Sequence, residues 1–304
     1  FGLSPVHTDA MYEEKARELV ERAGVDAVMI KDAGGLLTPD RIRTLVPAVR
    51  RGIDAAKNAG HVKLELHSHC MTGLCPLVYH EGVKLGVDQV HTAIPPLANG
   101  ASQPALQTMT RNLRGMGYEV DVDLDLADEI GEYYERVAEQ EGKPVGKVAE
   151  YDAFHFEHQI PGGMISNFRS QLAELGMSDR LNDILHEAAR VRGDPRALGR
   201  LRVVPQIVGT QAMLNVTCGE RYRIVPDELK RYVLGYNGKL LAPVDPNVLD
   251  RIMQNGSADI PEKHEEPEPG LAALRRKYPN ASDEERLLRY SYAGSQVDDM
   301  LATG

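Results

Sequence analysis

Two histidines separated by one residue, His67 and His69, have the side chains and the spacing to bind a metal ion. They follow residues 62–66, which we predict to form a buried strand. In an extended chain, residues i and i+2 point to the same face, so both imidazoles can reach one divalent ion. Imidazole suits Zn, Co, Ni, Cu and Fe among the divalent metals. The alternative is a polar strand end that carries two solvated histidines.

Lys31 directly follows another apolar run, residues 25–30, and opens the stretch Lys31-Asp32-Ala33-Gly34-Gly35-Leu36. A lysine that is buried at a strand end has a lowered pKa, which permits nucleophilic or carbamate chemistry. The alternative is an ion pair between Lys31 and Asp32.

A glycine-rich turn occupies residues 158–167, His-Gln-Ile-Pro-Gly-Gly-Met-Ile-Ser-Asn, and leads into a predicted helix. Gly162 and Gly163 let a ligand approach the backbone closely. Ser166 has two interpretations, which do not exclude each other. Its hydroxyl is a plausible N-cap for the helix that follows, and it is also a group that can give and take a proton.

The three cysteines, Cys70, Cys75 and Cys218, are too few and too irregularly spaced for a disulfide framework. We therefore expect reduced thiols and a cytoplasmic protein, either free or peripheral to a membrane complex. Cys70 and Cys75 lack the second pair that a structural zinc site would need.

Strands and helices alternate over the first 100 residues. We predict strands at 25–30, 62–66 and 87–94, with helices at 9–23, from Thr38, at 74–85 and at 103–116. Crossover helices between strands imply parallel pairing. Lys31, His67 and the Ile94-Pro95-Pro96 turn then follow strand ends, where a (β/α)8 barrel carries its active site. Three or four strands do not close such a barrel, which leaves a partial barrel or an open sheet.

The remainder of the chain is predicted to be mainly helical. Helical patterns cover residues 125–141, 181–191, 206–216 and 226–234. Residues 263–269 are acidic and proline-rich, as in a linker, and Ser282 to Glu285 form a capping box before a last helix. We expect a partial barrel over residues 1–117 and a helical domain over residues 118–304.

Composition limits the partners. The 304 residues include 35 Lys+Arg against 45 Asp+Glu, for a net charge of −10, which argues against nucleic acid as a partner. No apolar run reaches the roughly 18 residues of a membrane span.

Several of these motifs together resemble one enzyme family, the biotin-dependent carboxyltransferases of the pyruvate carboxylase and oxaloacetate decarboxylase type. The segments that carry the resemblance occur in the family's order. They are Ser4-Pro5-Val6-His7-Thr8, Lys31 to Pro39, Leu66 to Gly73, Gln159 to Asn167, Gln206 to Ala212, and Ser282 to Val297.

The resemblance implies a TIM barrel followed by a helical funnel domain, of which this chain carries about the last three or four strands and the funnel. His67, His69 and a carbamylated Lys31 would bind a divalent metal, with Zn, Co or Mn expected. The family's fourth ligand, an Asp of the first barrel strand, is not in this sequence, nor are the residues that grip pyruvate. An N-terminal barrel half is therefore an expected partner, in a homo- or hetero-oligomer.

The resemblance also implies the reaction. A carboxyl group would move between carboxybiotin and pyruvate or oxaloacetate through an enolate that the metal-centred site supports. Gly162, Gly163 and Ser166 would lie at the biotin side, where the Ser166 hydroxyl would carry the proton. No Ala-Met-Lys-Met motif occurs, so the biotin would be carried by another domain or chain.

Two other functions remain open from the sequence. A metal-dependent aldolase or lyase of a related barrel group would also use a His-x-His pair and enolate chemistry, but it would not need a biotin funnel. A non-catalytic half-barrel that only supports assembly would not need Lys31, His67, His69 and Ser166 together.

Overall fold

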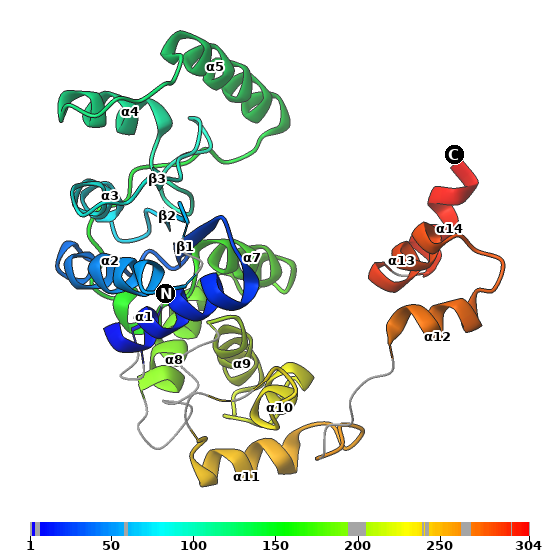
Figure 1. Ribbon diagram of the computed structural model, residues 1–304. Coiled ribbons are helices and arrows are strands. Elements are labelled where there is room, and N and C mark those ends of the chain that lie inside the picture. The colour runs from blue at the N-terminus through cyan, green and yellow to red at the C-terminus, as the bar shows by residue number, and fades with distance from the viewer. Residues whose placement is uncertain are drawn as a thin grey trace. The chain divides into compact units, whose positions relative to one another are not determined.

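The computed structural model contains a small parallel sheet flanked by helices, followed by a longer, mainly helical part (Figure 1). It describes residues 2–3, 7–57, 60–193, 205–238, 240, 243–262, 269–292 and 294–303. The sheet has the order β1-β2-β3, with all pairs parallel. The strands are β1 (Ala27–Asp32), β2 (Lys63–Ser68) and β3 (Gln89–Val90). Parallel strands joined by helices confirm the predicted α/β class.

The helices of the first part lie near their predicted positions, and Thr38 caps its helix by accepting from the Arg41 amide at 3.2 Å. They are α1 (Asp9–Glu18, continued by a π-helical turn, Leu19–Ala23), α2 (Pro39–Asp54), α3 (Cys75–Lys84) and α4 (Leu106–Gly115).

The second part is mainly helical, as predicted, and its described residues contain no strand. Its helices are α5 (Leu124–Glu141), α6 (His155–His158), α7 (Gly162–Glu174), α8 (Leu181–Gly193, after a 3₁₀ turn at Ser178–Arg180), α9 (Pro205–Cys218), α10 (Asp227–Val233), α11 (Pro246–Asn255), α12 (Gly270–Lys277), α13 (Asp283–Ser291) and α14 (Gly294–Thr303). The predicted capping box forms, because Ser282 accepts from the Glu285 amide at 3.0 Å. Residues 4–6 and 263–268 of the predicted segments lie outside the described residues.

The chain divides into two compact units, Phe1–Ile260 and Pro261–Gly304. The first unit contains two hydrophobic clusters, one drawn from residues 16–113 and the other from residues 160–252. The predicted domain boundary between residues 117 and 118 falls between these clusters and stays a prediction. None of the helices in the described part of the chain is long and apolar enough to cross a bilayer.

The two faces of the sheet differ in character. On one face, apolar side chains of β1 and β2, such as Ile30 and Leu66, are buried in the first cluster with α2 and α3, which lie along the same side of the sheet (Figure 1). On the other face, Met29 and Lys31 are exposed, and Glu65 and His67 are partly buried. Alternation along an extended chain produces this division, so the polar side chains gather on a single face.

The first two strands end later than the sequence predicted, and the third ends earlier. β1 continues to Asp32 and β2 to Ser68, so Lys31 and His67 lie inside their strands rather than after them. The strand predicted at 87–94 is reduced to Gln89–Val90, followed by a single bridge between Ala93 and Ala105. Pairing goes no further because the chain turns away at Ile94-Pro95-Pro96, where the two prolines lack the amides that a ladder needs.

Close packing of α1 on α2 generates a first prediction. A Cβ added to Gly52 would collide with the backbone carbonyl of Glu13, whereas one added to Gly115 would meet nothing within 4 Å. Overpacking a backbone contact is costly, so we expect Gly52→Ala to lower the free energy of unfolding by about 2 kcal/mol or more. Gly115→Ala, the matched control, should change it by at most about 1 kcal/mol in the stabilising direction. Denaturant titration of both variants checks this, and equal stabilities would contradict it.

Candidate active site

A row of polar side chains crosses the exposed face of the sheet. The register places the Cα of Lys31 opposite that of His67. It pairs Leu66 with Val90, so His91 follows as the neighbour of His67 on the third strand. The amide of His91 continues this ladder by donating to the Leu66 carbonyl at 3.0 Å. Lys31 of β1, His67 of β2 and His91, which directly follows β3, therefore lie side by side.

The imidazoles of His67 and His69 face each other. Their Nε2 atoms lie 3.0 Å apart, although His69 follows the last residue of β2. The amide of His69 donates to the Asp32 carbonyl at 3.2 Å, which keeps the backbone extended past the strand end. The spacing in the sequence thus predicted this geometry for the correct physical reason.

The two histidines fit a divalent ion. Burial is the main cause that lowers the pKa of His67 to about 4, and the electrostatic interaction with neighbouring His69, His91 and Lys31 lowers it further. Burial also lowers the pKa of His69. Both rings are therefore neutral at pH 7, and a neutral imidazole is the form that binds metals. Two nitrogen atoms 3.0 Å apart can both reach one ion at the usual His–metal distance of about 2.0–2.1 Å.

Lys31 is exposed in this structure, on the same face of the sheet as His67. The expected burial of Lys31 is therefore wrong, although Lys31 lies beside the histidines as predicted. Asp32 points to the opposite face, where its carboxylate accepts from the amides of Leu36 and Leu37 and from the Ser68 hydroxyl. This arrangement does not support the alternative of an ion pair between Lys31 and Asp32.

The loops that follow β1 and β2 pack directly on each other. Gly35 has a φ of +65°, and a Cβ there would lie 2.6 Å from the His69 carbonyl. Only glycine combines this left-handed conformation with so close an approach. The Thr72 hydroxyl donates to the Gly35 carbonyl at 3.0 Å. The loop after Lys31 is thus fixed against the loop that carries His69.

The glycine-rich turn meets the same loops. A Cβ added to Gly162 would lie 2.6 Å from Ala101 Cβ and 2.6 Å from Met71 Sδ. Met71 comes two residues after His69, and Ala101 comes two residues before Gln103, whose amide lies 3.3 Å from His67 Nε2. A Cβ added to Gly163 would meet nothing within 4 Å. Gly162 therefore packs the start of α7 onto the histidine loops, and Gly163 presents open backbone.

Ser166 does not cap α7, so that prediction is wrong. The helix begins four residues earlier, at Gly162, because the extended Pro161 already serves as its N-cap. Ser166 lies in the second turn, where its hydroxyl donates to the Gly162 carbonyl at 3.2 Å. Its side chain is exposed, and the other interpretation of Ser166, a proton carrier, stays a prediction.

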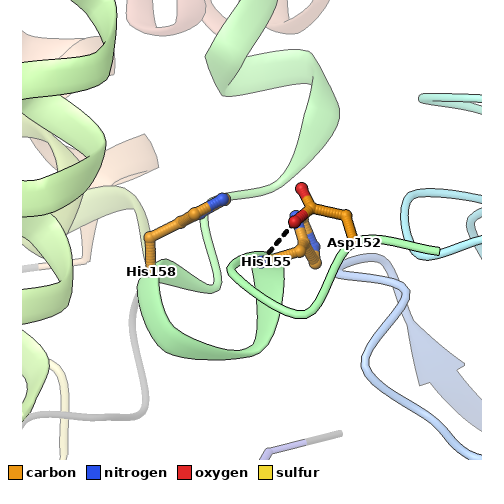
Figure 2. A group of neighbouring side chains, drawn as sticks. All are labelled: Asp152, His155 and His158. Atoms are coloured by element: carbon orange, nitrogen blue, oxygen red, sulfur yellow. Dashed lines mark hydrogen bonds between the residues drawn. The ribbon is translucent and has the colours of Figure 1, made fainter. Parts of the chain in front are cut away.

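Asp152, His155 and His158 form a second group of ligand-type side chains, which the sequence reasoning did not single out (Figure 2). Asp152 accepts from the amides of Phe154 and His155 and so stabilises the turn that leads into α6. His155 Nε2 lies 2.5 Å from the Gly34 carbonyl, which joins α6 to the loop after β1. The signal in the sequence was the i, i+3 spacing of two histidines after an aspartate.

Hydrogen bonding accounts for this second group. His158 Nδ1 accepts from the Ile160 amide at 3.0 Å, so in the neutral ring the proton is on Nε2, the atom that would otherwise bind a metal. Burial, with the neighbouring charge of His155, lowers the pKa of His158 to about 4. In addition, buried Arg192 of α8 donates to the His158 carbonyl at 3.0 Å. The group therefore anchors the glycine-rich turn.

The sequence reasoning also missed Glu65, His91 and Gln103, which surround His67. Strand alternation would have placed Glu65 on the face of His67, and the predicted third strand contained His91. The two buried cysteines near the site, Cys70 and Cys75, are free thiols as expected. The Cys75 thiol lies 3.2 Å from the Ser68 carbonyl, and burial raises its pKa.

Comparisons with known proteins identify related sequences. Residues 156–299 match the family model of a conserved carboxylase domain. The chain is 39% identical to a pyruvate carboxylase subunit of Methanocaldococcus jannaschii over 263 residues, or 86% of this chain and 45% of the relative. It is 32% identical to the methylmalonyl-CoA carboxyltransferase 5S subunit of Propionibacterium freudenreichii over 252 residues, or 82% of this chain and 48% of the relative. The chain thus spans somewhat less than half the length of these relatives.

A solved structure shows the same fold. The carboxyl transferase domain of Rhizobium etli pyruvate carboxylase, solved with pyruvate and biocytin, superposes with a TM-score of 0.80 at 22% identity. The match covers 98% of this chain and 52% of that domain. It confirms the predicted fold class, a partial barrel followed by helices.

The lowered histidine pKa values predict acid sensitivity. When the pH falls below about 6.5, the unfolded chain takes up protons that folded His158 does not bind until about pH 4. The contribution of neutral His158 to the free energy of unfolding is therefore fully present above about pH 6.5, and it is lost as the pH falls toward 4. In His158→Asn, the side-chain oxygen of the asparagine can accept from the Ile160 amide in an Asx turn, and asparagine does not titrate.

We expect His158→Asn to reduce the loss of unfolding free energy between pH 7 and pH 5 by on the order of 1–2 kcal/mol, after allowance for partial screening by solvent. Urea titrations of the wild type and the variant at both pH values measure it. The same pH dependence in both proteins would show that His158 is not the group responsible.

Proposed function

Because the chain belongs to the biotin-dependent carboxyltransferase family that includes the pyruvate carboxylases, we propose that it supplies the metal-binding and biotin-facing parts of such an enzyme. The enzyme would move a carboxyl group between carboxybiotin and pyruvate or oxaloacetate. The observation that carries the proposal is the contact of Gly162 with Met71 and Ala101. It brings the glycine-rich turn against the loops of the His67–His69 pair, so one site can hold both the metal and the carboxyl donor.

His67, His69 and Lys31 would hold the divalent ion, for which Zn, Co and Mn are the candidates. The facing Nε2 atoms and the lowered pKa values of both rings support the two histidine ligands. Lys31 would contribute as a carbamate. The carbamate would bring an anionic oxygen to the cation, beside the two neutral imidazoles, which the amine itself does not have. The bound ion would supply the positive charge that stabilises the enolate of the acceptor.

Ser166 would carry the proton. Its hydroxyl donates to the Gly162 carbonyl, which holds the oxygen at the start of α7 and leaves its lone pairs available. After carbon dioxide leaves the donor, the hydroxyl would give its proton to the ureido group of biotin and take one from the methyl group of pyruvate. Gly163, exposed and with open space where a Cβ would lie, would let the biotin ring approach the backbone.

The sheet itself supports the proposed partners. Among the described residues β1 is an edge strand, and a pocket of about 190 Å³ beside it is lined by residues of α1 and β1 that include Met29 and Lys31. In a closed barrel this edge would be paired, because exposed edge strands associate with other strands. We propose that a further set of barrel strands covers it, and that a biotin carrier domain approaches from the side of α7.

The assembled enzyme tests the role of Ser166. We expect Ser166→Asn to fold normally but to lower the rate of carboxyl transfer by on the order of a hundredfold or more, because the amide cannot relay a proton. Ser166→Thr should keep most of the activity. Ser170→Asn is the matched control, since Ser170 lies one turn later on α7 and its hydroxyl donates to the Ser166 carbonyl at 3.4 Å.

The assay follows pyruvate-dependent decarboxylation of carboxybiotin and, separately, proton exchange at the methyl group of pyruvate with free biotin present. If Ser166→Asn transfers carboxyl groups at the wild-type rate, the proton moves by another route and the proposed role of Ser166 is wrong. If Ser170→Asn is equally impaired, the loss reflects the helix rather than the hydroxyl.

A further inference from the structure

Glu65, His91 and His67 form a continuous chain of side-chain contacts on the exposed face of the sheet. Glu65 Oε2 lies 3.2 Å from His91 Nε2, and His91 Nδ1 lies 3.1 Å from His67 Nδ1. The His67 and His91 rings meet edge to face, at 89°. The chain ends at His67 Nε2, which faces His69 Nε2.

The Glu65 carboxylate, at one end of this row of contacts, indicates which ring nitrogens of His91 and His67 carry protons. A proton on His91 Nε2 can be donated to Glu65 Oε2, and in the neutral ring this leaves a lone pair on His91 Nδ1. That lone pair can accept a proton donated by His67 Nδ1. Since a neutral imidazole has one proton, Nε2 of His67 keeps its lone pair, and this is the atom that faces His69.

Gln103 independently indicates the same tautomer. Its Nε2 lies 3.3 Å from His67 Nε2, and an amide nitrogen can only donate. The other end of the amide, Oε1, accepts from the Ser102 hydroxyl at 3.4 Å, which agrees with this orientation. Two partners on opposite sides of the His67 ring thus require a proton on Nδ1 and a lone pair on Nε2.

We propose that His91 and Glu65 are positioning residues that hold the His67 proton on Nδ1, so that Nε2 is available to a divalent cation before the cation binds. This inference rests on the proposed metal site and adds two residues to it. Histidine ligands of metals are generally held by such a hydrogen bond from the second ring nitrogen, and its loss costs about 10–100-fold in metal affinity.

The fold fixes the position of His91 as well as its protonation. The buried hydroxyl of Tyr79, on α3, accepts from the Ser68 amide at 2.9 Å and donates to the His91 carbonyl at 2.8 Å. It therefore ties the end of β2 to the residue that follows β3. His91 is held beside His67 by backbone contacts, so changes to its side chain alter the hydrogen bond and leave the row of strands in place.

The experiment measures binding of Zn²⁺ to the full chain, in buffer with bicarbonate, by competition with a chromophoric chelator. We expect His91→Phe, which keeps a ring but offers no acceptor, to weaken zinc binding about 10–100-fold. His91→Asp restores an acceptor for the Nδ1 proton and should stay within about threefold of the wild type. Glu65→Gln should give an intermediate loss, because an amide permits either tautomer of His91. His61→Phe removes an exposed histidine that precedes β2 and should change nothing.

Nitrogen-15 NMR of the metal-free chain reads the tautomer directly. The wild type should show His67 protonated on Nδ1, and His91→Phe should show a mixture of both tautomers. If the wild type binds zinc and His91→Phe binds it with the same affinity, this inference is overturned and the proposed metal site stands. The same holds if His67 of the wild type is protonated on Nε2. If the wild type binds no zinc, the proposed metal site is wrong and the inference fails with it.

Discussion

The buried carboxylate of Asp32 connects the parts of the site. It accepts from the amides of Leu36 and Leu37, both at 2.9 Å, and from the Ser68 hydroxyl at 2.8 Å. The first two bonds fix the loop after β1, and the third ties that loop to the last residue of β2. Burial raises the pKa of the Asp32 carboxyl, and the three hydrogen bonds lower it only in part. A buried acid is tolerated where its partners are all supplied, and here they come from both strands.

The remaining contacts of the site depend on this connection. With the loop fixed, the Gly34 carbonyl is available to His155, and the Gly35 carbonyl is available to Thr72. The first contact docks α6 on the sheet, and the second packs the histidine loop on the loop after β1. The glycine-rich turn then follows α6 and reaches Met71 through Gly162. Helices and sheet thus meet along the edge where the strands end.

The sequence predicted what local periodicity determines. The positions of α1 to α5, the parallel strands, and the facing histidines all follow from spacing and capping, and the structure agrees with them. Lys31 was placed beside the histidines, although its burial was not as expected.

The errors have a common physical origin in long-range contacts. Helix α7 begins at Gly162 rather than near Ser166 because the extended Pro161 is its N-cap, and this helix start packs on Ala101 and Met71, far away in the sequence. His91 could not be assigned to the site without the register between β2 and β3, and Asp152 and His155 required the contact with Gly34. A single sequence shows the hydrophobic periodicity of each helix or strand, but it does not show which distant segment each loop contacts.

We propose that His67 and His69 together form a metal site. Crystals of the chain soaked with Zn²⁺ and measured at the zinc absorption edge would locate the ion. We expect one strong anomalous peak within about 2.0–2.1 Å of both Nε2 atoms, with Lys31 beside it. A peak at Asp152, His155 and His158 instead, or no peak near His67 while the protein remains folded, would contradict it.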